Sequence, residues 1–227
     1  MMKILLIAGH GQGDPGACGN GYKEAEQARH LVSMIQSILK NYAEVTVFDP
    51  TKNMYKYLKN GEIFNFSPYR YIFEVHFNAG GGEGTEILVH ENQKGVSVEE
   101  NILKNVSALG FKNRGVKRRD NLQNMNVIFR KGKDYALLET CFIDSTSDMA
   151  IWKNKAYDIA LAVANGIISG FGLSTGNAEL TTPNDIVWEL AQQIEITNRD
   201  KAVNDLTRAM NENSSCYWML KKIANKR

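Results

Sequence analysis

Short apolar runs alternate with longer stretches of helical periodicity through most of the chain. The runs have the length and composition of buried strands, and they predict strands over residues 3–8, 44–48, 71–76, 85–89, 127–129 and 135–140. Apolar residues return at helical spacing after Gly21, over 99–109 and over 150–168. Because strands and helices alternate, the pattern predicts an α/β fold, with a layered, mostly parallel sheet and helices on both faces.

A polar, glycine-rich stretch over residues 170–177 follows the last long helical pattern. Such a stretch is typical of a domain boundary, so we expect one domain over 1–174 and a linker over 175–182. The remaining residues, 183–227, carry three short helical patterns with apolar faces. They predict a small all-α module, which at about 45 residues can barely bury a core of its own.

The composition is that of a globular protein and argues against nucleic-acid-binding proteins and proteins built on cysteine pairs. Hydrophobic residues make up 43% of the 227 residues, and the net charge of +2 is too small for the concentrated basic surface that nucleic-acid binding requires. Three cysteines, Cys18, Cys141 and Cys216, form no Cys-x-x-Cys pair. They therefore predict neither a disulfide framework nor a cysteine zinc site.

No apolar run approaches the roughly 18 residues that a membrane helix needs. The run before Gly9 is too short for the core of a signal peptide, and no cleavage pattern follows it. We therefore expect a protein that is made in the cytoplasm, does not insert into membranes and depends on another agent for any export.

Four residues near the ends of predicted strands or at the start of a helix could carry chemistry: His10, Glu24, His76 and Glu139. Two imidazoles and a carboxylate can hold zinc while a second carboxylate acts on water, as metal-assisted hydrolysis requires. Each residue also has a structural interpretation. Either histidine could simply cap a strand, Glu24 could interact with a helix N-terminus, and Glu139 could mark a strand end, because a carboxylate inside an apolar strand is costly.

Four segments in the same order resemble the type 3 family of zinc-dependent N-acetylmuramoyl-L-alanine amidases, which includes autolysins and phage endolysins. The resemblance spans residues 3–172. The family's two metal-histidine segments are similar to Ile7-Ala8-Gly9-His10-Gly11 and Val75-His76-Phe77-Asn78-Ala79. Its metal-glutamate segment is similar to Gly21-Tyr22-Lys23-Glu24, and its catalytic-glutamate strand to Leu137-Leu138-Glu139-Thr140.

This resemblance implies zinc-dependent hydrolysis of the amide bond between N-acetylmuramoyl and L-alanine in peptidoglycan, and hence lysis of the cell wall. One zinc ion would be held by His10, Glu24 and His76. Glu139 would accept the proton of the attacking water and return it to the leaving nitrogen. Asn78 and Arg114 are expected to bind substrate. The alternatives are a zinc peptidase acting on stem peptides and a cell-wall-binding module without catalysis.

The resemblance also implies peptidoglycan as the partner, reached at the cell wall through a holin, through lysis or by an unknown route. Residues 183–227 could target the wall, hold a homo-oligomer together or simply form a docked structural appendage. A basic cluster from Lys112 to Arg119 could face anionic wall polymers or lie in a solvated turn.

Two further residues need an explanation. Glu74 stands where the family often has a small residue, two places before the second histidine, and alternation puts it on the same strand face as His76. It could compete with the metal ligands or support them. Cys141 would share the face of Glu139 by the same alternation, which makes a cysteine nucleophile the rival to a metal. A cysteine in an apolar strand is more often a small buried apolar group.

Overall fold

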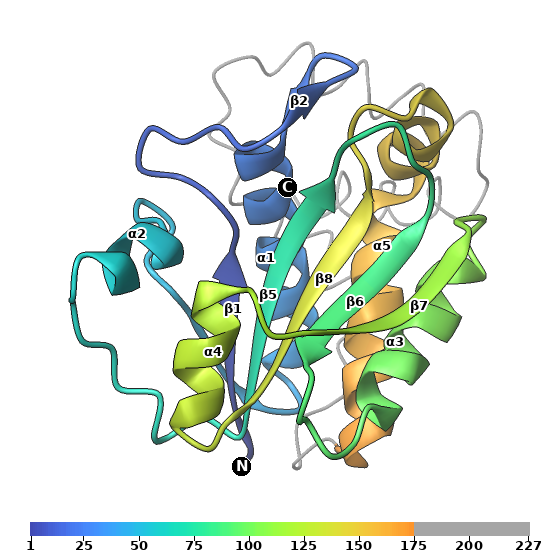
Figure 1. Cartoon of the computed structure of the whole chain (residues 1–227). Helices are drawn as coiled ribbons and strands as arrows, with labels where there is room; N and C mark the ends of the chain where they lie inside the picture. The colour runs from blue at the N-terminus through green and yellow to red at the C-terminus, as the bar shows by residue number, and fades with distance from the viewer. Residues whose placement is uncertain (175–227) are drawn as a thin grey trace, which may run out of the picture. The chain divides into compact units, whose positions relative to one another are not determined.

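A six-stranded sheet forms the centre of the computed structural model, which describes residues 1–174 (Figure 1). The strands lie in the order β4 (Glu44–Val47), β1 (Lys3–Ala8), β5 (Tyr71–Asn78), β8 (Asp134–Phe142), β6 (Thr85–His90) and β7 (Asn113–Arg119). The first four are parallel, β6 is antiparallel to β8, and β7 is parallel to β6. This order confirms the predicted mostly parallel sheet.

Helices cover both faces of the sheet, as predicted. One face carries α1 (Glu24–Leu39), α3 (Ser97–Ser107) and α5 (Thr146–Phe171), and the other carries α2 (Met54–Lys59) and α4 (Gln123–Arg130) (Figure 1). A short pairing of β2 (Cys18–Gly19) with β3 (Tyr22–Lys23) precedes α1. Among residues 1–174, no helix combines the length and the apolar content needed to cross a membrane.

The core on the α2 and α4 side explains where polar side chains can gather. Ile72 and Leu137 of the sheet belong to one buried cluster with Ile128 of α4. Side chains on one face of a strand are two residues apart, so Ile72 is followed on this face by Glu74 and then His76. The face therefore changes from apolar to polar toward the carboxyl end of β5.

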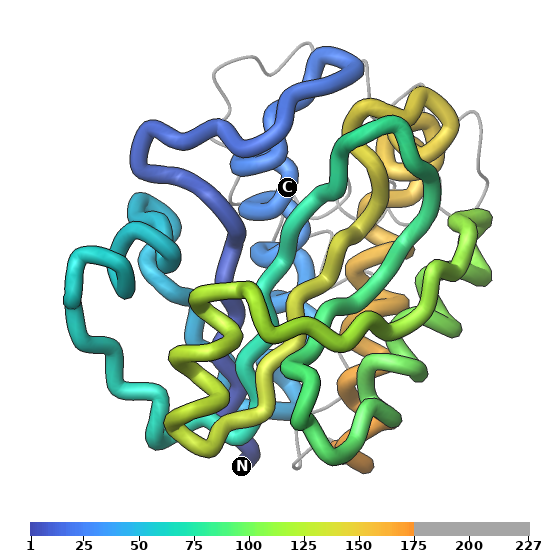
Figure 2. The backbone as a smooth tube through the Cα atoms, viewed as in Figure 1, coloured from blue at the N-terminus to red at the C-terminus, as the bar shows by residue number. Residues whose placement is uncertain are grey.

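Three connections meet beyond this end of the sheet. Figure 2 shows that the chain after β1 rises past the sheet and folds back into α1, and that the connections from β5 to β6 and from β8 to α5 lie at the same end. Ligand sites of open α/β sheets gather at the carboxyl ends of strands. The segments that carry His10, His76 and Glu139 therefore approach one another.

Two local predictions are wrong. Residues 127–129 are not a strand but part of α4, whose buried residues Asn124, Met125 and Ile128 follow helical spacing. Three apolar residues in a row carry no period that could distinguish the two. The basic cluster does not lie in a turn but largely in β7, an edge strand whose charged side chains discourage further pairing.

The predicted linker over 175–182 and the predicted helical module over 183–227 lie outside the described residues, as does Cys216. Their structures and roles stay predictions.

Candidate active site

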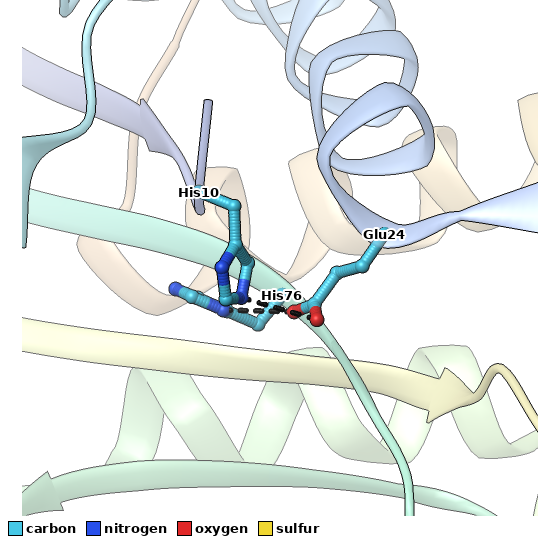
Figure 3. Close-up of side chains that lie close together, drawn as sticks. All are labelled: His10, Glu24 and His76. Atoms are coloured by element: carbon cyan, nitrogen blue, oxygen red, sulfur yellow. Dashed lines mark hydrogen bonds and ion pairs between the residues drawn. The ribbon is translucent and has the colours of Figure 1, made fainter. Parts of the chain in front are cut away.

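The structure brings together three of the residues singled out in the sequence: His10, Glu24 and His76 (Figure 3). His10 lies in the loop after β1, Glu24 begins α1, and His76 lies near the end of β5. One ligand atom from each residue lies within 4.8 Å of the other two. The Glu24 carboxylate contacts both rings, with Oε2 at 3.1 Å from Nε2 of His10 and Oε1 at 2.9 Å from Nδ1 of His76.

The loop after β1 holds His10 in an unusual backbone conformation. Its φ of 61° lies in the left-handed region, which is uncommon outside glycine and recurs at functional sites. Asp14 accepts hydrogen bonds from Nδ1 of His10 and from the backbone N–H of Gly16, each over 3.0 Å. A β-carbon on Gly16 would lie 2.6 Å from Oε2 of Glu24, so the loop needs a glycine there.

Arg29 of α1 ties the same loop to the body of the protein, a role that the sequence pattern did not predict. Its guanidinium donates to the backbone carbonyls of Gly9 and His10, each over 3.0 Å, and to that of Pro50 over 2.7 Å. Arginine presents five donors in a rigid fork, which suits several carbonyls at once. Nothing in the local sequence distinguishes this arginine from one exposed on a helix surface.

Glu24 is a buried carboxylate, with an exposed fraction of 4%. It accepts hydrogen bonds from the backbone N–H groups of Ala17 and Phe77, over 2.9 and 3.0 Å, neither of which belongs to α1. These bonds and the two imidazoles offset the cost of burying a charged group. Interaction with its own helix N-terminus therefore does not explain this residue.

Glu139 lies inside β8, paired with His76 in the register of β5 and β8. Its Oε2 is buried and has no hydrogen-bond partner among residues 1–174. Burial raises the pKa of its carboxyl group to about 7; His76 opposes this shift, while Glu24 and Glu86 add to it. A carboxylate with a free oxygen and a pKa near neutrality can accept a proton and release it again.

Each histidine is held between two carboxylates: His10 between Glu24 and Asp14, and His76 between Glu24 and Glu74. Burial acts to lower the pKa of both imidazoles, but the carboxylates outweigh it and raise both pKa values, that of His76 strongly. Burial acts to raise the pKa of Glu24, but the two rings outweigh it and hold that pKa well below its usual range. The centre of the cluster therefore stabilises positive charge.

The donor set fits zinc. Two histidines and one glutamate are a ligand combination found in catalytic zinc sites, which keep a further position open. The ring nitrogens on the far side of the cluster, Nδ1 of His10 and Nε2 of His76, already contact carboxylates. Proteins commonly orient zinc-binding histidines in this way. His10, Glu24 and His76 could therefore hold one zinc ion, with Glu139 beside it.

Asn78 and Arg114 meet at Glu86 of β6. Asn78 Nδ2 donates to Oε1 of Glu86 over 3.1 Å, and Arg114 Nε donates to Oε2 over 2.8 Å. Glu86 is in turn paired with Glu139 in the register of β6 and β8. The two residues expected to bind substrate thus lie close to the candidate base, and the charge of Arg114 has a partner. Their contact with substrate stays a prediction.

A cavity of about 530 Å³ extends from the two histidines toward α2 and α4. Polar side chains from both helical segments line it, including Asn53, Tyr55, Gln123 and Asn124. The sequence pattern did not predict this lining, because it depends on two segments some 70 residues apart in the chain coming together. A cavity with a few convergent polar groups beside residues of shifted pKa is the expected form of a substrate site.

Cys141 does not share the face of Glu139, contrary to the prediction from alternation. Between the pairs His76–Glu139 and Asn78–Phe142, β8 has one residue more than β5, a bulge that breaks the alternation. The Cys141 sulfur instead contacts Met149 of α5, and burial raises the pKa of its thiol well above the usual value. A cysteine nucleophile therefore has no structural support.

Comparison with known proteins gives consistent matches. A family model described as N-acetylmuramoyl-L-alanine amidase matches residues 4–169. The chain is 30% identical over 194 residues to the N-acetylmuramoyl-L-alanine amidase CwlM of Bacillus licheniformis, a match that covers 79% of this chain and 73% of the relative. It is 29% identical over 203 residues to probable autolysin PH of Staphylococcus aureus, which covers 80% of this chain but only 42% of that protein.

Among solved structures, the CwlD amidase of Clostridioides difficile, determined in complex with the GerS lipoprotein, has a similar fold. The TM-score is 0.65 at 21% sequence identity, and the match covers 76% of this chain and 99% of that one.

Proposed function

The chain belongs to the N-acetylmuramoyl-L-alanine amidase family, and on that premise we propose that it uses one zinc ion to hydrolyse the amide bond between N-acetylmuramoyl and L-alanine in bacterial peptidoglycan. The observation that carries the proposal is the convergence of ligand atoms of His10, Glu24 and His76 within 4.8 Å of one another. Beside them lies a carboxylate, Glu139, whose Oε2 has no hydrogen-bond partner in the described part of the chain. When bound, zinc supplies the Lewis acidity that polarises an amide carbonyl and makes water a stronger acid.

Glu139 moves the proton in this mechanism. Its Oε2 accepts a proton from the water that attacks the amide carbonyl, and the resulting carboxylic acid passes that proton to the leaving alanine nitrogen. A pKa of about 7 suits both transfers, because the group is readily deprotonated before the attack and protonated after it. The neighbouring Asn78 and Arg114 are the residues that we propose to contact the substrate.

Digestion of purified peptidoglycan by the full chain tests this function. We expect mass analysis to find intact stem peptides with a new N-terminal alanine, together with glycan chains that have lost their peptides. A chelator should stop the release, and added zinc should restore it. Glu139→Gln should retain zinc yet lower the rate of release by at least about 100-fold. Glu62→Gln, at an exposed position, is the matched control.

Other products would favour the alternatives. Shortened stem peptides would indicate a zinc peptidase, and binding to peptidoglycan without new amino termini would indicate a wall-binding module. Full activity in Glu139→Gln would refute the role given to that residue.

We also propose that the protein acts at the bacterial cell wall, with peptidoglycan as its partner. Exposed cations such as Lys112 and Arg119, at either end of β7, could add contacts to anionic wall polymers. The route to the wall, and the part that residues 183–227 play in wall targeting or in a homo-oligomer, stay predictions.

A further inference from the structure

Glu74 is a second buried carboxylate at this site, with an exposed fraction of 3%. It lies on β5 between Ile72 and His76 on the same strand face, and it is paired with Leu137 in the register of β5 and β8. A carboxylate among such neighbours is costly to bury unless donors surround it. Glu74 must therefore have partners that offset this cost.

Three donors from three elements surround the Glu74 carboxylate. His76 Nε2 lies 2.9 Å from Oε1, the Tyr135 hydroxyl donates to Oε2 over 2.7 Å, and Asn124 Nδ2 lies 3.2 and 3.0 Å from the two oxygens. Tyr135 and Asn124 are themselves buried, at 1% and 6% exposure. Glu74 is thus held in place from β8 and α4, with one oxygen directed at the imidazole.

We propose that Glu74 is a positioning residue that makes Nδ1 of His76 the atom facing the metal. Both ring nitrogens contact a carboxylate, Nδ1 that of Glu24 and Nε2 that of Glu74. Glu24 is one of the candidate zinc ligands and Glu74 is not, so in the zinc-bound site the hydrogen of the neutral ring would lie on Nε2, where the Glu74 carboxylate accepts it. The lone pair is then on Nδ1, the nitrogen that lies 2.9 Å from Glu24, another residue of the ligand cluster. This inference rests on the proposed function, because it assumes zinc at the cluster.

The same geometry shows whether Glu74 competes with the metal ligands or supports them. Glu74 contacts the nitrogen of His76 that points away from Glu24, and it is not a member of the ligand cluster found among residues 1–174. It therefore supports the metal ligands rather than competing with them. Because Asn124 also lines the 530 Å³ cavity, α4 connects the wall of that cavity to the orientation of His76.

Zinc affinity, measured by competition with a chromophoric chelator, tests the proposal on the full chain. Glu74→Gln should weaken zinc binding about 10- to 100-fold. Tyr135→Phe, which removes one donor and keeps the ring, should weaken zinc binding less. If Glu74→Gln does not fold, the zinc affinity of Tyr135→Phe alone tests the proposal. Glu99→Gln is the matched control, because Glu99 is also a buried carboxylate that accepts from a tyrosine hydroxyl, that of Tyr71, but lies outside the cluster.

Nitrogen NMR of histidine-labelled, zinc-loaded protein gives a readout that a merely structural role would not move. We expect the hydrogen of His76 on Nε2; a hydrogen on Nδ1 would overturn the proposal. Unchanged zinc affinity in both Glu74→Gln and Tyr135→Phe would overturn it too, as would equal losses in Glu74→Gln and Glu99→Gln. If the unaltered chain binds no zinc, the proposed function fails first, and this inference fails with it.

Discussion

The ring of His76 lies against the backbone of Gly9: a β-carbon at residue 9 would fall 2.3 Å from Cε1 of that ring. Atoms that are not bonded do not approach so closely, so any larger residue at this position must displace the ring. The backbone N–H of Gly9 also donates to the carbonyl of Val75 on β5, which leaves the loop little room to move away. Gly9 thus determines where one of the candidate zinc ligands lies.

Gly9→Ala should therefore weaken zinc binding by at least about 10-fold. It should also lower the free energy of unfolding of the zinc-free protein by about 1–3 kcal/mol, the usual cost of overpacking. Chelator competition and urea unfolding measure the two effects. Gly95→Ala is the control, since no atom of the described residues lies within 4 Å of the added carbon; a similar loss in both variants would contradict the explanation.

Arg29→Met should loosen the loop that carries His10. The substitution keeps an unbranched apolar chain but removes the donors to the carbonyls of Gly9, His10 and Pro50. Leaving such carbonyls without donors costs about 1–3 kcal/mol. We expect a lower free energy of unfolding and weaker zinc binding. Normal zinc affinity in a destabilised variant would mean that Arg29 stabilises the fold without positioning His10.

Glu86→Gln should shift the acidic limb of the pH–rate profile to lower pH. Burial raises the pKa of Glu139, and the negative charge of Glu86 adds to this effect. A general base works only when deprotonated, so activity falls as the pH drops through its pKa. Removing the charge of Glu86 lowers that pKa and preserves activity further into acid. A limb that stays in place, or moves to higher pH, would contradict this account; Glu62→Gln is the control.

Glu99→Gln should make stability less sensitive to pH. Burial raises the pKa of Glu99 in the folded chain above the ordinary value of 4.5. The stability linked to this protonated group is complete below 4.5 and is lost as the pH rises through the raised pKa, because the unfolded chain ionises first. Glutamine does not titrate, so the variant should gain in unfolding free energy relative to the unaltered chain between acid and neutral pH. Urea unfolding across this range measures the difference.

The order of the motifs predicted which residues would meet, but not what holds them. Alternation along β5 correctly put Glu74 on the face of His76, because side chains on one face of a strand are two apart. The partners of Glu74 could not be predicted in this way. Asn124 and Tyr135 come from α4 and β8, so their contacts exist only once those elements pack.

Where the sequence pattern failed, the physical reason is local. A bulge in β8 turned Cys141 away from the face of Glu139, and a bulge leaves no trace in a period of two residues. The segment around Ile128 was too short to distinguish a strand from a helix, although Met125 and Ile128 follow helical spacing. The sequence pattern did not predict β7 because its residues are mostly charged or polar, and an edge strand needs no apolar alternation.

The place of β8 in the sheet has a consequence for the order of folding. β8 lies between β5 and β6, yet it is the last of the six strands along the chain. The strands on either side of it cannot join until residues 134–142 have been synthesised and inserted, and such distant pairings form slowly. Because Glu139 is part of this strand, the chain should acquire its proposed general base in the same step that completes its sheet. A chain still growing on the ribosome would then complete its sheet only when it already contains Glu139.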